Sequence, residues 1–118
     1  MTIQELDEKY YFHDSMITNI SYLVSDFKLI ITMEFCNWAQ NWYIEGDPEL
    51  VEFKLIFNGI ETYDGIVGDV DYYSILDGEV KNEKYHLFIE DDFHHAFYEY
   101  YLEPTSVDVV IGKPITDK

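Results

Sequence analysis

Two segments of this sequence alternate apolar and other residues with a period of two, and this pattern limits the folds open to the chain. The segments are residues 28–36 and 50–57. Their regularly spaced apolar residues are Leu29, Ile31, Met33 and Phe35 in the first and Val51, Phe53, Leu55 and Phe57 in the second. Because successive side chains of a β-strand point to opposite faces, each segment is predicted to be a strand with one face in a core and the other partly in water.

Turn-forming residues predict how these strands connect. Ser25-Asp26 separates residues 17–24 from residues 28–36, which predicts a β-hairpin. Asn58-Gly59 follows the 50–57 strand and offers two residues that tolerate positive φ, as a two-residue type I′ turn requires. Residues 60–63 are therefore expected to fold back beside that strand. Further strands are predicted at residues 70–76, 85–89, 96–102 and 106–111, with a polar turn at residues 81–84.

The segment 92–101 admits two interpretations. Its many aromatic side chains favour a strand, because they suit a pleated, half-buried surface. However, Phe93, Phe97 and Tyr100 also fit the spacing of a helix. The predicted fold is therefore all-β, an antiparallel sandwich or open barrel of about seven strands. The alternative is an α+β fold with a helix at residues 92–101.

The length of the chain predicts a single domain that covers residues 1–118, since two separate cores would both be too small. The first nine residues are expected to form a short helical turn, with Thr2 as its N-cap and Glu5 at the capping-box position. Residues 114–118 are expected to form a tail.

The charge of the chain restricts its partners. It has 24 Asp and Glu against 7 Lys, no Arg, and a formal net charge of −17. Such a surface repels nucleic acid and anionic membranes, so neither is expected as a partner. It attracts basic proteins and cations, unless the acidity serves only solubility. The single cysteine, Cys36, allows no internal disulfide, and no signal peptide or membrane-length apolar run is seen, so the cytoplasm is the expected location.

A family resemblance enters at residues 11–20, where Tyr11-Phe12-His13-Asp14-Ser15 precedes spaced aliphatic residues and the 29–35 strand. This run resembles the opening of small bacterial immunity-type proteins of polymorphic toxin systems, some of them grouped as immunity protein 50-like. The resemblance implies a protein that binds and neutralises a cognate toxin, and it implies no catalytic residue. Residues 36–43 depart from the family pattern.

Two groups of residues match metal ligands in type but not in arrangement. His13-Asp14 is a dipeptide used by HD-class hydrolases, but those enzymes are helical and need further His and Asp ligands on helices. The other group is Asp91, Asp92, His94 and His95, where adjacent side chains diverge on a strand and on a helix. No metal or other cofactor is therefore expected. Cys36 has no neighbouring His or basic residue that would activate it, so no enzyme is expected either.

Aromatic and acidic side chains gather between the 28–36 and 50–57 strands, where they suit a protein-binding loop. They are Trp38, Trp42, Tyr43, Glu45, Asp47 and Glu49. Large amphipathic rings often anchor a partner, although they can also fold back over one end of a sandwich. A second acidic segment, residues 63–73, contains Asp64, Asp69 and Asp71. It lacks the ligand order of an EF-hand, so a strand connection is expected, with weak calcium binding as the alternative.

These observations favour a non-catalytic protein that binds a basic partner, such as a toxin. A metal-dependent enzyme that uses His13 and Asp14 is one alternative. A subunit that self-associates through an exposed β edge is the other.

Overall fold

The structure, a computed structural model, describes residues 1–115 of the chain. Within these residues the sequence folds into a short helix and seven strands, so the predicted all-β class is confirmed. The elements are α1 (Ile3–Lys9), β1 (Met16–Leu23), β2 (Lys28–Cys36), β3 (Leu50–Asn58), β4 (Gly68–Lys81), β5 (Lys84–Asp91), β6 (Ala96–Leu102) and β7 (Ser106–Pro114).

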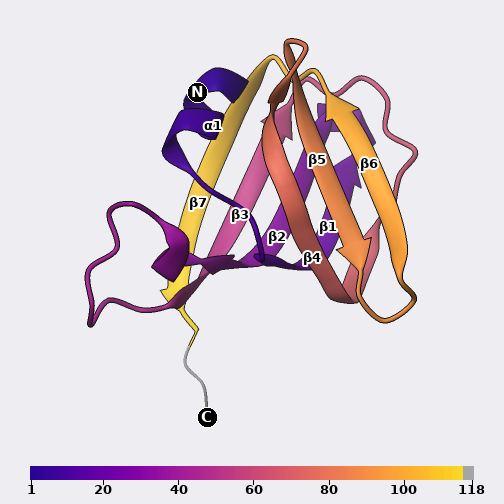
Figure 1. Cartoon of the computed structure of the whole chain (residues 1–118). Coiled ribbons are helices and arrows are strands. Elements are labelled where there is room, and N and C mark those ends of the chain that lie inside the picture. Colours follow the sequence, from indigo (N-terminus) through magenta and orange to yellow (C-terminus); the bar gives the residue numbers. More distant parts are fainter. Residues whose placement is uncertain (116–118) are drawn as a thin grey trace.

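The strands form one antiparallel sheet in the order β6-β5-β4-β1-β2-β3-β7. The sheet curls, so that β4, β5 and β6 lie in front of β1, β2, β3 and β7 (Figure 1). Among the described residues β6 and β7 pair on one side only, which leaves the barrel open. The core fills the space between the two halves of the sheet, and α1 packs beside β4 and β7.

The alternating sequence of β2 and β3 is reproduced in their burial. The two strands pair in regular register, so that Met33 lies opposite Phe53 and Phe35 opposite Val51 on the inner face. All four side chains are buried, and the rings of Phe35 and Phe53 stack with their centroids 4.4 Å apart. These two strands therefore provide much of the apolar wall of the core.

The expected hairpin after Asn58-Gly59 is wrong. Gly59 has a φ of 76°, but it begins a loop over residues 59–67, and β3 pairs with β2 and β7 instead of residues 60–63. Thr105 N donates to Asn58 O, so the connection between β6 and β7 lies against the end of β3. The long-range pairing with β7 replaces the local pairing.

The other predicted connections agree with the structure. β1 and β2 form the expected hairpin, and β4 and β5 join through a two-residue turn at Asn82 and Glu83, both with positive φ. In the ambiguous segment 92–101, residues 96–101 belong to strand β6, so the helical alternative is wrong. The expected tail begins inside β7, because Pro114 still pairs with Val51, and residues 116–118 of that tail lie outside the described part of the chain.

The predicted helical turn within the first nine residues is confirmed. Thr2 Oγ1 accepts a hydrogen bond from Glu5 N at 3.1 Å, and Glu5 Oε1 accepts one from Thr2 N at 2.7 Å. This reciprocal capping box satisfies two amide groups at the start of α1. No helix within residues 1–115 has the length and apolar character needed to cross a membrane.

Candidate functional site

The predicted binding segment is a loop over residues 37–49, called the 37–49 loop below, which extends beyond the sheet in Figure 1. Gln40 fixes its first half from a buried position. Its Oε1 accepts from Tyr11 N at 2.9 Å, and its Nε2 donates to Tyr11 O at 2.7 Å and to Cys36 O at 2.9 Å. The loop is therefore joined to the segment that follows α1, although neither segment forms a strand there.

Further hydrogen bonds close the base of the loop. Trp38 N donates to Glu49 O at 3.1 Å, and Asn37 Nδ2 donates to Pro48 O at 2.9 Å. At the tip, Asp47 bonds to Ile44 in both directions, through N to the carbonyl at 2.9 Å and through Oδ2 from the amide at 3.3 Å. The loop is thus stabilised by hydrogen bonds between its own polar groups.

This loop exposes large apolar side chains. Trp38 is 50% exposed, Trp42 40% and Ile44 69%. Trp42 also meets the buried ring of Tyr10 edge to face, with the centroids 5.6 Å apart. The alternative that the rings fold back therefore applies in part to Trp42, whereas Trp38 is the more exposed of the two rings.

The three acidic residues of the same loop all lie near the Tyr43 hydroxyl. Burial, together with the negative charges of Glu49, Asp47 and Glu45, raises the pKa of the Tyr43 hydroxyl. All three carboxylates are exposed. Tyr43 and the three carboxylates therefore lie close to one another, on the same loop as the two exposed tryptophans.

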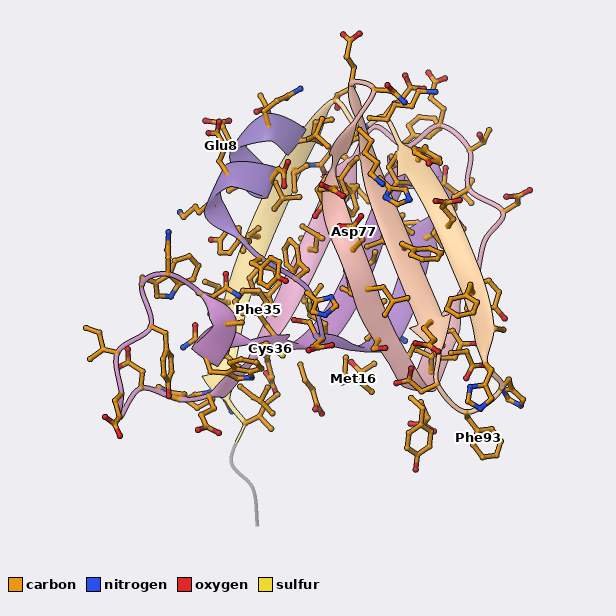
Figure 2. The ribbon with its side chains drawn as sticks, viewed as in Figure 1. Glu8, Met16, Phe35, Cys36, Asp77 and Phe93 are labelled. Carbon is orange, nitrogen blue, oxygen red and sulfur yellow. The ribbon has the colours of Figure 1, made fainter. Side chains whose placement is uncertain are left out.

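The second acidic segment forms a separate surface. Asp69 accepts a hydrogen bond from Asn19 Nδ2 at 2.8 Å, and Asp69 and Asp71 line a shallow hollow with Phe93. The 37–49 loop projects at the left in Figure 1, whereas Phe93 lies at the lower right in Figure 2, which is drawn in the same view. Asp64 is exposed in the 59–67 loop. Within residues 1–115, none of these three acids belongs to a group of three side chains that could bind one metal ion together.

The histidines considered as metal ligands have structural partners. His13 Nδ1 lies 2.7 Å from Leu76 O, which gives its N–H a carbonyl acceptor, and His13 Nε2 lies 3.5 Å from Asp14. His94 Nδ1 lies 2.8 Å from Asp91, whose carboxylate also accepts from the amides of Phe93 and His94. The first pair ties the N-terminal segment to β4, and the second lies in the turn before β6.

A cluster that the sequence analysis did not single out lies on the outer face of β4 and β5. One carboxylate oxygen from each of Asp77 and Glu79 and one ring nitrogen of His86 lie within 4.8 Å of one another, the only such group of three in the described part of the chain. A signal for it was available. The two-residue turn at residues 82–83 places Glu79 opposite His86, and Asp77 lies two residues along the strand.

Asp77 and Glu79 also line a hollow of about 280 Å³ between β4, α1 and the start of the 37–49 loop. Asp7, His13 and Gln40 line the same hollow.

The single cysteine, Cys36, does not line this hollow. It is buried, and burial raises the pKa of its thiol, which keeps it protonated and unreactive at neutral pH. Comparisons with protein-family models, curated proteins and solved structures give no match.

Proposed function

We propose that this chain is a non-catalytic cytoplasmic protein that binds a basic protein through the 37–49 loop. The observation that carries the proposal is the combination of exposed apolar side chains and three exposed carboxylates on a loop fixed by its own hydrogen bonds. A surface of this kind suits a partner with exposed Lys and Arg around an apolar patch.

The fixed conformation of the loop supports this use. A loop that is already ordered loses less conformational freedom on binding, so more of the contact energy remains as affinity. Trp38 and Trp42 offer large rings with few rotatable bonds, the type of side chain that dominates many interfaces. The high negative charge of the chain would raise the rate of encounter with a basic protein.

The resemblance of residues 11–20 to immunity-type proteins suggests the class of partner. A toxin of a polymorphic toxin system is a protein that must be neutralised stoichiometrically, and binding alone achieves this. The first observation to make is therefore whether a basic protein is encoded beside this chain, and whether co-expression of the two relieves growth arrest.

Kinetics with that basic protein test the surface. The association rate is expected to fall steeply from low to physiological salt, with a smaller effect on dissociation, because screening acts mainly on the encounter. Reversing Glu45, Asp47 and Glu49 together to Lys should slow association. The matched control reverses Asp26, Glu61 and Glu83, which are exposed and lie outside the loop, for the same change in net charge.

Single substitutions locate the anchor. Trp38→Ala should speed dissociation by roughly tenfold or more, equivalent to about 1.4–2 kcal/mol. Trp42→Ala should do the same with some loss of stability, because Trp42 packs on Tyr10. Phe93→Ala is the control at the second acidic surface. Loss of binding in Phe93→Ala with normal binding in Trp38→Ala would place the interface there, and a salt-insensitive association rate would reduce the charge to a solubility feature.

A further inference from the structure

His86 is buried although it lies on the outer face of the sheet. Its side chain is only 3% exposed. The ring of Tyr101 on β6 packs against it with the centroids 4.8 Å apart, and the ring of Phe88 lies along the strand at 6.0 Å. A polar ring covered in this way needs partners for both nitrogens, because an unpaired buried polar atom costs free energy.

Only one of the two nitrogens has such a partner. Nε2 lies 2.5 Å from Glu99 Oε2. A carboxylate can only accept, so this contact places the proton on Nε2. Nδ1 lies 3.3 Å from Asp77 Oδ2, but out of line for a hydrogen bond, and it has no hydrogen-bond partner within residues 1–115. In the neutral ring, Nδ1 then presents a lone pair toward Asp77 and Glu79.

A bulge in β4 brings the first carboxylate to this lone pair. Ile75 pairs with Ile89 and Asp77 with Phe88, so one extra residue of β4 lies between the two pairs. Ile75 is fully buried in the core, and in a regular strand Asp77 would share its face. The bulge turns Asp77 to the outer face, a re-aiming of side chains that bulges next to functional sites often provide. Figure 2 shows Asp77 on β4 at the front of the molecule.

We propose that Asp77, Glu79 and His86 bind a divalent transition-metal ion of the zinc class, with Glu99 as the residue that orients His86. This site is independent of the 37–49 loop and of any partner. The donor set is one imidazole nitrogen and two carboxylate oxygens, which suits zinc, whereas calcium and magnesium prefer oxygen ligands alone. A histidine that donates its other N–H to a carboxylate is the usual arrangement around such ions.

The geometry allows closure around an ion. Zinc ligands at about 2.0–2.2 Å from the metal lie roughly 3.4 Å apart in a tetrahedral site. The three ligand atoms lie within 4.8 Å of one another, and the Asp77 and Glu79 side chains are about one third and two fifths exposed. Small rotations of these carboxylates would complete the site.

The local charge favours a cation here. The carboxylates of Asp7, Asp77 and Glu79 all line the hollow beside α1, and Asp7 Oδ2 accepts a hydrogen bond from Val80 N at 3.1 Å. Lys81 is the cation nearest to Asp77 and Glu79, with Nζ 3.8 Å from an oxygen of each carboxylate. A divalent ion would bind in its place, so Lys81 is expected to compete with the metal.

Calorimetric titration of the metal-stripped full chain with zinc tests the site. The unaltered chain should bind one zinc ion per molecule. Asp77→Asn combined with Glu79→Gln should weaken binding at least tenfold, and Glu99→Gln should weaken it about 10- to 100-fold through the orientation of His86. Lys81→Met should tighten it. These side chains are exposed enough to change without loss of the fold, which a circular dichroism spectrum checks.

Two controls separate this site from surface histidines. His94→Ala removes a competing exposed imidazole and should leave the stoichiometry unchanged. Nitrogen NMR of the His86 ring should show a proton on Nε2 before zinc is added and a shift confined mainly to Nδ1 afterwards. Unaltered zinc affinity in the Asp77→Asn, Glu79→Gln variant, or an imidazolium at His86 that keeps both protons when zinc is added, would overturn the proposal.

Discussion

At the scale of single residues, Gln40 determines how the 37–49 loop is held. Its amide makes three hydrogen bonds to the backbone of Tyr11 and Cys36, all within or beside the core. Replacing Gln40 by Leu keeps a similar volume but leaves those groups unpaired. We expect the free energy of unfolding to fall by about 2–3 kcal/mol, measured by urea denaturation.

The matched control for this change is Asn41→Leu at the neighbouring exposed position. It should alter stability by no more than about 0.5 kcal/mol. A loss below that value for Gln40→Leu would show that water replaces the amide easily, and it would weaken the case that the loop is fixed before it meets a partner.

Residues differ in how far the sequence predicts their role. The N-cap of Thr2 follows from local spacing, and the structure agrees. The sequence left open whether the loop aromatics fold back, and in the structure Trp38 is half exposed. The burial of His86 does not, because it depends on rings from β5 and β6 that cover it. The orientation of Asp77 depends on a bulge, and nothing in the residues around position 76 indicates one.

At the scale of elements, the β4–β5 turn carries a backbone cost. Asn82 and Glu83 both have positive φ, and Lys81 pairs with Lys84 directly beyond them. Asn adopts this conformation at low cost, whereas Glu83 carries the steric penalty between its Cβ and the backbone. Glu83→Gly should therefore raise the free energy of unfolding by about 0.5–1 kcal/mol, measured by urea denaturation.

Glu83→Ala is the control for that substitution, because it removes the same charge without giving the backbone new freedom. It should give no such gain. Equal stabilisation by both variants would assign the effect to charge and not to the turn.

Most elements could be predicted because their signals are local. Strands β2 and β3 follow from alternation, and the β1–β2 hairpin follows from Ser25-Asp26. The exception is the segment after Asn58, where turn chemistry predicted a hairpin. There, β7 occupies the free edge of β3, and Ile60 is buried within the 59–67 loop, where its N donates to Phe27 O at 2.8 Å. Such a pairing joins residues about 50 positions apart, which no local pattern reveals.

At the scale of the whole molecule, the formal charge of −17 opposes the compact state. The 24 acidic side chains outnumber the 7 Lys more than threefold, so the chain carries a large excess of negative charge. Added sodium chloride screens this repulsion, and the thermal midpoint is expected to rise between low and physiological ionic strength. A chelator in the buffer keeps divalent ions from contributing.

The variant in which Glu45, Asp47 and Glu49 are all changed to Lys is measured for comparison. By lowering the net negative charge it should reduce the dependence of the midpoint on salt. A midpoint that falls with salt in the unaltered chain would show that attractive ion pairs, such as those of Lys81 with Asp77 and Glu79, outweigh the general repulsion.

The position of β7 has a consequence for how the chain folds. The last strand pairs with β3, and Val107 also exchanges backbone hydrogen bonds with Met1, 106 positions earlier. The part of the sheet formed by β1, β2 and β3 therefore lacks β7 until residues 106–114 have been synthesised, and one edge of β3 stays unpaired until then. Contacts this distant in sequence make folding slow. The nascent chain therefore presents an apolar strand edge to other chains, and aggregation competes with folding during that interval.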